Sequence, residues 1–341
     1  MKENSQIVAD SLRSQIRSGV LEPGSRLPSF LEFRDQGISQ TSAEQIYDRL
    51  QEEGLIRRVR GNGVFVAQLG LETRKGALGF LINDVSTALP YYLHLLKGVR
   101  EVARREGQEL LLLDDAAGAR VDGLLMQSVG IEALRRRLPE TIPAVVLGAP
   151  AQGLPSVNAD DFAGARGATE YLLSLGHHRI GYLIDIVEGG VVPRNRFDGY
   201  RAALTEAGVK FDIRWLGHMT NYGEMAQRGY IGMRDWMNGN WKKLGCTALL
   251  VQNDRAAIGA MQALQQNGYR VPEDVSVIGF DGTDECELAT PHLTSVEVPL
   301  RQMGVQAAEL LLAMIRQESL ECTTNVWPTE LRVRDSTAPI D

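Results

Sequence analysis

Residues 38–66 read ISQTSAEQIYDRLQEEGLIRRVRGNGVFV, and this stretch decides the fold of the N-terminal part of the chain. Its apolar positions recur at i, i+3, i+4 and i+7, the spacing of one buried helix face: Ala43, Ile46, Tyr47 and Leu50. Ser39 is suited to cap this helix, because its hydroxyl can accept a hydrogen bond from an amide of the first turn. The stretch therefore predicts a helix that starts after Ser39 and ends at Gly54.

Two short strands are predicted behind this helix, at residues 56–59 and 64–67. They flank the RGNG segment at residues 60–63, whose glycines and asparagine tolerate the positive φ angles of a hairpin tip. A helix followed by a two-stranded wing is the pattern of a winged helix-turn-helix, which reads DNA. The sequence thus predicts a DNA-binding domain over residues 1–68 and a polar linker over residues 69–75.

The same region resembles the GntR family. GSRLPSFLEF, ISQTS and LQEEGLIRRVRGNGVFVA follow the pattern of its DNA-binding domains, and an apolar repeat of Val8, Leu12 and Ile16 fits the preceding helix. The resemblance covers roughly residues 4–68. Base and phosphate contacts are expected from basic and small polar side chains: Arg26, Ser29, Arg34, Gln40, Thr41, Ser42, Arg49, Arg58, Arg60 and Asn62.

Two departures from the family bear on DNA affinity. The family usually has Arg where this chain has Gln40 and Glu44. Residues 1–70 also carry nine Lys and Arg against nine Asp and Glu, so this region is neutral. Because phosphate neutralisation supplies most non-specific affinity, we expect weak, salt-sensitive binding. The alternative for any one of these polar residues is a solvated helix surface without a role in binding.

Composition narrows the class of protein. The chain has 341 residues, enough for two or three domains, and a net charge of −7, which disfavours indiscriminate coating of nucleic acid. Its three cysteines (Cys246, Cys286 and Cys322) form no CxxC pair, so neither disulfides nor a metal site are expected. The sequence shows no apolar signal segment and no long apolar run, which predicts a cytoplasmic protein without a membrane span.

From residue 76 onward, apolar runs alternate with amphipathic stretches. The expected strands are 77–82, 109–113, 123–127, 144–147, 179–184, 213–217, 248–251 and 275–280. The expected helices are 91–106, 131–138, 163–175, 197–207, 225–237 and 256–267. Strands alternating with helices of this length predict an α/β fold with parallel, doubly wound sheets.

This rear part resembles the LacI/GalR-type sensors, which are periplasmic-binding-protein-like pairs of lobes. The landmarks are SVNADDFAGARGATEYLLSLGHHRIGYL (156–183), RNRFDGYRAAL (194–204), ALLVQNDRAAIGAMQAL (248–264) and VPEDVSVIGFDGTDECELATPHLTSV (271–296). The resemblance implies a two-lobed sensor over residues 76–341. Lobe 1 is expected at about 76–158 and 298–322, and lobe 2 at about 159–297 and 323–341. A GntR-type module joined to such a sensor resembles the arabinose-repressor class of regulators.

In open parallel sheets, ligands bind beyond the carboxyl ends of the strands. The side chains expected to bind a ligand there are Tyr91, Tyr92, Asp160, Arg196, Tyr222, Asn253 and Asp281. The resemblance places a ligand-binding Arg at Arg196, ahead of Arg194, which could simply pair with Asp198. One of the two tyrosines is expected to be core. Asp160 could cap a helix, and Asp254 is expected to be a helix N-cap.

Further expectations concern scaffold and ligand. His177 and His178 are expected to be structural, and Trp236 and Trp241 to pack a helix end. Leu89 and Val298 stand where some sugar sensors have Asn and Gln, so a sugar is favoured only modestly over another small polar metabolite. Only nine residues, 114–122, separate two predicted strands, where a parallel crossover normally needs a dozen or more. This lobe is therefore expected to lack one helix or to use an unusual connection.

The sequence is compatible with three functions. The first is a ligand-controlled transcriptional regulator, more often a repressor, that binds a near-palindromic operator as a homodimer. The second is a ligand sensor whose DNA-binding module has degenerated. The third is an enzyme fused to a GntR-type module. The chain contains no GxSxG, HExxH or P-loop pattern, so we expect no enzyme and no cofactor.

Overall fold

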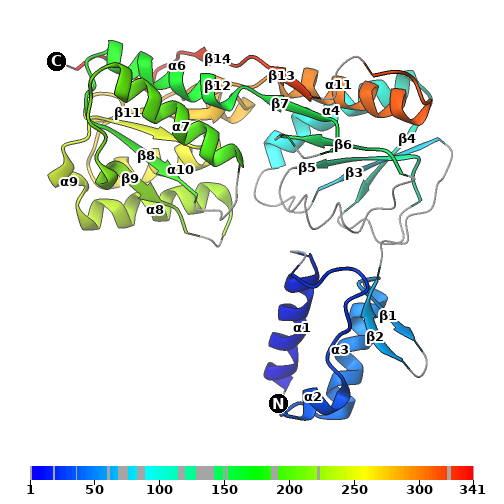
Figure 1. Cartoon of the computed structure of the whole chain (residues 1–341). Helices are drawn as coiled ribbons and strands as arrows, with labels where there is room; N and C mark the ends of the chain where they lie inside the picture. Colours follow the sequence, from blue (N-terminus) through cyan, green and yellow to red (C-terminus); the bar gives the residue numbers. More distant parts are fainter. Residues whose placement is uncertain are drawn as a thin grey trace. The chain divides into compact units, whose positions relative to one another are not determined.

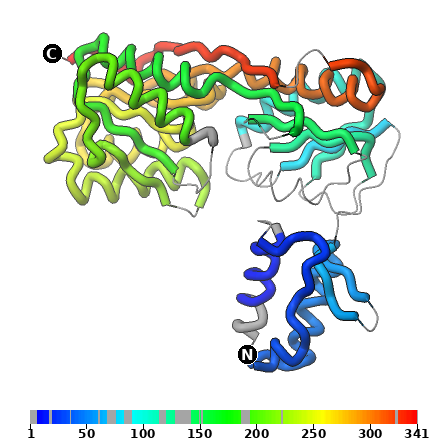
Figure 2. Tube along the Cα trace, in the orientation of Figure 1, coloured from blue at the N-terminus to red at the C-terminus, as the bar shows by residue number. Residues whose placement is uncertain are grey.

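The structure is a computed structural model, and it describes residues 2–17, 20–35, 37–59, 62–67, 76–82, 89–113, 120–127, 142–148, 150, 153–185, 191–220, 223–320 and 324–340. The chain divides into two compact units. One comprises Met1–Asn83, Val99–Ser156 and Val305–Thr324, and the other comprises Asp84–Gly98, Val157–Gly304 and Asn325–Asp341. Figure 2 follows the trace from the blue N-terminal module to the red C-terminal segment.

The N-terminal module has the predicted winged helix-turn-helix fold (Figure 1). Its elements are α1 (Lys2–Arg17), α2 (Phe30–Asp35), α3 (Gln40–Glu52), β1 (Ile56–Val59) and β2 (Gly63–Val66). The two strands pair antiparallel, with Val59 opposite Gly63. The second strand starts one residue earlier than predicted, because Gly63, at φ 115°, already pairs with Val59.

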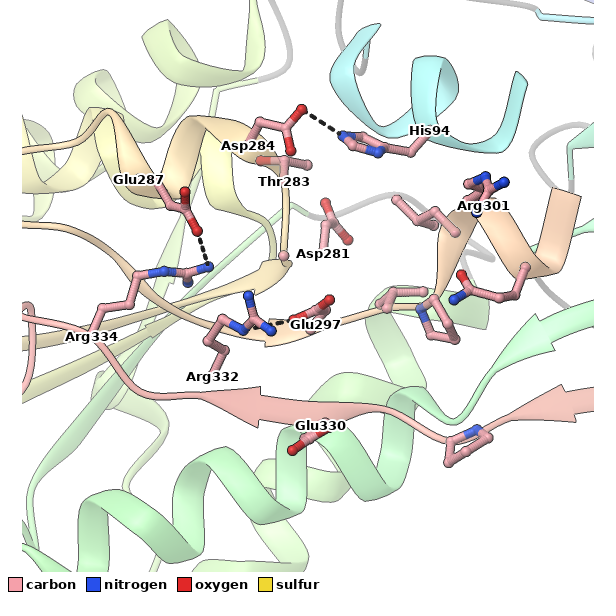
Figure 3. A pocket seen from close by; sticks show the side chains of 16 residues that line it. His94, Asp281, Thr283, Asp284, Glu287, Glu297, Arg301, Glu330, Arg332 and Arg334 are labelled. Carbon is pink, nitrogen blue, oxygen red and sulfur yellow. Dashed lines mark ion pairs between the residues drawn. The ribbon is translucent and has the colours of Figure 1, made fainter. Parts of the chain in front are cut away.

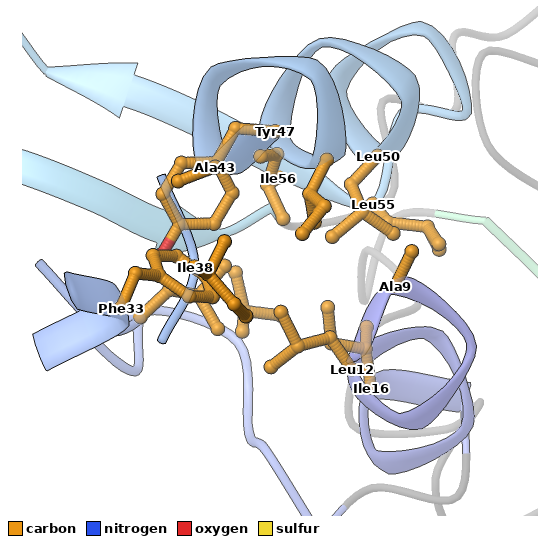
Figure 4. Packing of buried hydrophobic residues seen from close by; sticks show 13 residues of the cluster. Ala9, Leu12, Ile16, Phe33, Ile38, Ala43, Tyr47, Leu50, Leu55 and Ile56 are labelled. Carbon is orange, nitrogen blue, oxygen red and sulfur yellow. The ribbon is translucent and has the colours of Figure 1, made fainter. Parts of the chain in front are cut away.

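One apolar cluster holds this module together (Figure 4). The predicted face of α3 lies in it, with Ala43, Ile46, Tyr47 and Leu50 all at most 3% exposed. Ser39 caps α3 as expected by accepting from Ser42 N, and Gly54 follows the helix at φ 67°. A polar contact joins α1 to the end of α3, where Arg13 donates to both carboxylate oxygens of Glu53 at 2.7 Å.

The first sheet has six strands in the order β13-β7-β6-β5-β3-β4. They are β3 (Ala77–Leu81), β4 (Glu109–Leu113), β5 (Gly123–Gln127), β6 (Ala144–Leu147), β7 (Ser156–Ala159) and β13 (Thr324–Trp327). β3 pairs parallel with both β4 and β5, and β5 pairs parallel with β6. The long helices α4 (Leu89–Arg105) and α11 (Leu300–Ile315) precede β4 and β13 in the chain.

The second sheet has the order β14-β12-β11-β10-β8-β9 and is parallel except for the antiparallel edge strand β14. Its strands are β8 (Ile180–Ile184), β9 (Leu216–His218), β10 (Ala248–Val251), β11 (Ser276–Asp281), β12 (Thr294–Glu297) and β14 (Glu330–Arg332). Its helices are α6 (Asp161–Ser174), α7 (Val191–Glu206), α8 (Met225–Gly239), α9 (Trp241–Leu244) and α10 (Asp254–Gln266), with 3-10 turns η1 (Ile213–Trp215) and η2 (Asp284–Glu287).

Helices cover both faces of this sheet, as a doubly wound fold requires (Figure 1). Neighbouring residues of β8 point to opposite faces: Tyr182 stacks on Phe197 of α7, whereas a Cβ on Gly181 would lie 2.8 Å from Trp241. The predicted α/β class is therefore confirmed. Trp236 and Trp241 pack against each other beneath the sheet, which is a larger role than packing a helix end.

Several element predictions were wrong in detail. The helix expected at 197–207 is α7, which begins six residues earlier, and the strand expected from 213 starts only at Leu216, after a 3-10 turn. The short strands β7, β12, β13 and β14 and the helix α11 were not predicted. Most of these strands contain polar residues and have only three or four positions, so they show no apolar run.

The short connection between β4 and β5 stays open as a prediction. Residues 114–119 and the helix expected at 131–138 lie outside the described residues. β4 itself is an edge strand of its sheet, and its Leu112 is 55% exposed. An exposed leucine on an edge strand is compatible with the expectation that this lobe lacks one helix.

Candidate functional site

The buried side chain of Arg196 lies at the centre of a charged cluster at the carboxyl ends of the second sheet's strands. Its Nε donates to Asp161 Oδ1 at 2.7 Å, its Nη2 donates to Asp281 Oδ1 at 3.2 Å, and its Nη1 donates to the carbonyl of Gln252. The guanidinium carbon also lies 3.7 Å from the ring centroid of Phe280. These contacts use three of the five N–H donors of Arg196, so two remain for a ligand.

The Arg196 cluster contains more carboxyl groups than cationic groups. One guanidinium faces two buried carboxylates, Asp161 and Asp281. Burial raises the pKa of Asp281, Arg196 opposes that rise, and the nearby Asp254 and Asp161 add to it. Burial likewise raises the pKa of Asp161, and the positive charge of Arg196 lowers it by a smaller amount. A site with surplus carboxylate favours ligands that donate hydrogen bonds.

Backbone geometry at Asp281 sets it apart from the rest of the sheet. It ends β11 with φ 112°, a region that L-residues rarely adopt, and Gly282 follows at φ 71°. Such strain costs about 1–3 kcal/mol and persists where surrounding structure imposes it, often at ligand sites. The strained position is thus the last residue of β11, at the carboxyl end of the strand.

Tyr91 and Tyr92 of α4 belong to the same unit as the Arg196 cluster, and Tyr91 interacts electrostatically with it. Their rings meet edge to face at a centroid distance of 5.6 Å. Tyr92 is buried, as expected for one of the pair, whereas Tyr91 is half-buried. Burial, followed by the charges of Asp281 and Asp161, raises the pKa of the Tyr91 hydroxyl. Tyr91, Arg196 and Asp281, all three predicted from the sequence, therefore lie within electrostatic reach of one another.

A second buried ion pair continues along the same sheet edge. Arg228 of α8 donates from Nη2 to Asp185, which follows β8, and from Nε to the carbonyl of Thr220. Gln252 joins the two pairs, since its carbonyl accepts from Arg196 and its Oε1 accepts from Asp185 N at 2.7 Å. The ends of β11, β10 and β8 are thereby connected through one polar network.

The other sequence candidates have structural partners. Asp160 caps α6 by accepting from Ala163 N at 2.9 Å, and Asn253 caps α10 by accepting from Ala256 N at 2.8 Å. Tyr222 lies outside the described residues. Arg194 is 82% exposed and lies 3.8 Å from Asp198, as expected of a surface partner.

The prediction that Asp254 caps a helix was wrong. Asn253 is the cap, and Asp254 is fully buried, where it accepts from Thr283 N at 2.7 Å and from the hydroxyl of Ser295. The glycine at position 279 makes room for it, because a Cβ there would lie 2.5 Å from Asp254 Oδ1. His177 has the structural role expected of it, with ring nitrogens 2.9 Å from Thr247 Oγ1 and 3.0 Å from Ser276 Oγ.

Sequence reasoning missed Asp161, Gln252 and the Asp185–Arg228 pair. The Asp160-Asp161 doublet was a signal, but only the structure shows that the first carboxylate caps α6 and the second pairs with Arg196. No described group of three or more His, Cys, Asp and Glu could hold a metal ion. None of the described helices is long and apolar enough to cross a bilayer.

In the N-terminal module, α3 offers an exposed polar surface. Gln40, Thr41 and Arg49 are exposed and Ser42 is half-buried, while Arg26 and Arg34 are exposed outside this helix. A Cβ on Gly63 would lie 3.1 Å from Arg26 Nε, so this arginine lies against the start of β2. Asn62 is exposed beside the wing tip, and Arg60 lies outside the described residues.

Several of these polar groups are engaged within the module. Gln40 Nε2 donates to Glu44 Oε1 at 3.2 Å, and Arg58 Nη2 donates to Asp48 Oδ1 at 2.6 Å. Ser29 forms a capping box with Glu32, whose pKa is lowered by the backbone and hydroxyl hydrogen bonds of Ser29. Arg58 must therefore leave a carboxylate before it can neutralise a phosphate.

Comparisons with known proteins agree with both parts of the fold. The model of the gntR family of bacterial regulatory proteins matches residues 4–66, and that of the periplasmic binding protein-like domain matches residues 169–337. The HTH-type transcriptional regulator CelR of Thermobifida fusca is 31% identical over 276 residues, which cover 74% of this chain and 78% of that protein.

Two further relatives extend this agreement. The arabinose metabolism transcriptional repressor of Geobacillus stearothermophilus is 26% identical over 363 aligned positions, covering 96% of this chain and 95% of that protein. A solved structure described as the transcriptional regulator CelR–cellobiose complex is 26% identical, with a TM-score of 0.69 over 88% of this chain and 91% of that one. The chain belongs to the bacterial transcriptional regulators with a LacI/GalR-type, periplasmic binding protein-like sensor, here joined to a GntR-family DNA-binding domain.

Proposed function

We propose that this protein is a sugar-responsive transcriptional repressor that binds a near-palindromic operator as a homodimer in the bacterial cytoplasm. Residues 1–68 bind DNA, residues 69–75 are a linker, and residues 76–341 form the two-lobed sensor. The observation that carries the proposal is the Arg196–Asp161–Asp281 cluster, at the strand ends of a sensor fold that follows a winged helix-turn-helix. The protein acts by binding, without catalysing a reaction.

A sugar fits the chemistry of this cluster. Hydroxyl groups both donate and accept, so they match a guanidinium with two spare donors beside carboxylates that accept. Tyr91 offers an aromatic ring to a sugar face. Relatives support the same class, since one is named for arabinose metabolism and one solved structure contains cellobiose. We assign ligand contacts to Tyr91, Arg196 and Asp281.

Coupling between sugar and DNA is the central test. The full chain is used to select duplexes from a random library, and binding of the selected DNA is then measured with pentoses, hexoses and disaccharides added. We expect a near-palindromic site and at least one sugar that lowers operator affinity about 5- to 150-fold, the usual range of allosteric coupling. Binding without sequence preference and unaffected by every sugar would remove the proposal. Sugar binding without DNA binding would instead mean a degenerate DNA-binding module.

Glu44→Arg is expected to strengthen DNA binding. The substitution removes a carboxylate from the exposed face of α3, frees Gln40 from its 3.2 Å contact and adds a guanidinium. One additional phosphate contact steepens the dependence of log K on log salt by about 0.9. Fluorescence anisotropy at salt concentrations between about 50 and 200 mM measures both effects. Glu52→Arg, at the exposed far end of α3, is the matched control for net charge. Equal gains from the two variants would show that α3 does not face DNA through Glu44.

Effector affinity is expected to rise with pH. Because burial raises the pKa of Asp281, part of the free protein holds a proton there near neutral pH. Effector hydroxyls donate to the carboxylate, so binding releases that proton, and affinity increases by up to about tenfold per pH unit until Asp281 is fully ionised. Isothermal titration from about pH 5 to about pH 9, on both sides of the raised pKa, measures this dependence. Asp281→Asn should bind weakly and without this slope. An affinity that grows on acidification contradicts the assignment.

A further inference from the structure

The second unit contains a cavity of about 420 Å³, of whose lining residues the proposed function assigns a ligand contact only to Asp281 (Figure 3). Its size falls within the range of small-molecule sites, about 300–1,000 Å³. Three chain segments form it: the turn after β11, the connection from β12 into α11, and the segment around β14. His94 of α4 completes the wall. We name it the β14 cavity.

The lining of the β14 cavity is polar and of mixed charge. Nine of its sixteen residues are ionisable, comprising five carboxylates, three guanidiniums and one imidazole. Arg332 Nε lies 3.0 Å from Glu297 Oε2, and His94 Nε2 lies 3.4 Å from Asp284 Oδ2. Figure 3 shows these pairs on different sides of the cavity. Donors and acceptors thus line the same space, and the surplus of carboxylates disfavours anions such as phosphates.

The ion pairs on this lining can rearrange at low cost. The side chains of Arg332 and Glu297 are 56% and 43% exposed, and Asp284 is 80% exposed. Exposed pairs of this kind contribute only about 0–1 kcal/mol. A ligand can therefore replace one partner of each pair, which suits hydroxyl groups that bond to either sign of charge.

Asp281 joins the β14 cavity to the Arg196 cluster. It lines the cavity, and the same carboxylate accepts from Arg196 through Oδ1. The strained turn at Asp281 and Gly282 forms part of the cavity wall, and a Cβ on Gly282 would lie 2.7 Å from Glu297 Cα. Asp281, Glu297 and Arg332 line the same cavity, so a ligand bound to Asp281 can extend through it toward the other two side chains.

We propose that the β14 cavity is a second sugar subsite, contiguous with the Arg196 cluster through Asp281, so that the effector is a saccharide of two rings. This inference rests on the proposed function, since it extends the same effector site. One ring binds at Arg196 and Asp281, and the second ring binds between Glu297 and Arg332. The surplus of carboxylates disfavours a sugar phosphate of equal length.

The test uses the full chain and isothermal titration with disaccharides, their constituent monosaccharides and the matching monosaccharide phosphates. One disaccharide is expected to bind at least about tenfold more tightly than its monosaccharides, the effect of one hydrogen bond to a charged group. Glu297→Ala and Arg332→Ala should each remove about that tenfold gain and leave monosaccharide affinity unchanged. The matched control is Glu170→Ala, which removes a 48%-exposed carboxylate paired with Arg166 on α6, away from the cavity lining.

The outcomes separate this inference from the proposed function. A monosaccharide that binds as tightly as every disaccharide containing it, with no effect of Glu297→Ala, overturns the second subsite and leaves the sugar sensor intact. Preferred binding of the phosphate also overturns it. If Glu170→Ala weakens the disaccharide as much as Glu297→Ala does, the loss is not local to the cavity, and the subsite is overturned. Binding that survives Arg196→Ala in full would contradict the proposed function instead.

Discussion

Arg196→Ala is expected to lower effector affinity about 10- to 150-fold, while DNA binding without effector stays at its wild-type level. The range corresponds to about 1.5–3 kcal/mol for hydrogen bonds to a charged group. The physical reason is that the guanidinium orients two buried carboxylates and keeps two donors for the ligand. Isothermal titration gives the effector affinity, and anisotropy with operator DNA gives the second quantity.

The same substitution is expected to destabilise the second unit in a pH-dependent way. Removing one partner of a buried ion pair costs about 3–5 kcal/mol. Without Arg196, the already raised pKa values of Asp161 and Asp281 rise further, so the folded state holds more protons than the unfolded state. Stability is therefore retained at low pH and lost as pH rises through the raised pKa values. Thermal unfolding of the variant at several pH values measures this loss.

Arg194→Ala is the matched control, two residues earlier on the same helix. Its side chain is 82% exposed and pairs only loosely with Asp198, at 3.8 Å. The control should keep wild-type effector affinity and melting temperature. If Arg196→Ala keeps its effector response, or if both variants lose it equally, the ligand site does not lie at the Arg196 cluster.

Part of the fold and part of the candidate site could be predicted from the sequence, through periodicity and the positions of strand ends. The apolar face of α3 follows from a 3.6-residue repeat, and the parallel sheets follow from alternating apolar runs. Asp281 was predicted because it directly follows a strand end, where parallel sheets gather polar groups. Arg196 was predicted from the resemblance to the LacI/GalR-type sensors, which places a ligand-binding Arg at this position. The helix face, the sheets and Asp281 follow from local properties, or from properties fixed by the sheet's direction, so one sequence suffices to find them.

The remaining parts depend on contacts between distant segments. Asn253 and Asp254 are adjacent and have equivalent cap chemistry, and only the packing of α10 against Gly279 decides that Asp254 turns inward. Asp161 pairs with Arg196 across 35 residues, and Glu297 pairs with Arg332 across the β12–β14 register. No spacing rule encodes such pairs, because each partner lies on a separate element.

Leu50→Ala is expected to abolish operator binding by unfolding the N-terminal module, with effector binding by the sensor unchanged. Leu50 is fully buried in a single cluster of thirteen residues. Replacing a buried Leu by Ala costs about 2–5 kcal/mol, and a module of this size has only roughly 3–10 kcal/mol of stability to lose. Calorimetry should show the module's transition moved to lower temperature or lost, and the sensor's transition unchanged.

Leu31→Ala tests whether burial is the cause of that loss. It makes the same chemical change in the same module, but Leu31 is 61% exposed. Exposed substitutions usually change stability by less than about 0.5 kcal/mol, so this variant should keep the module's transition. Loss of the sensor's transition in Leu50→Ala would mean that the two parts fold as one cooperative body. Retained operator binding in Leu50→Ala would mean that the cluster around α3 is not what holds the DNA-binding surface in place.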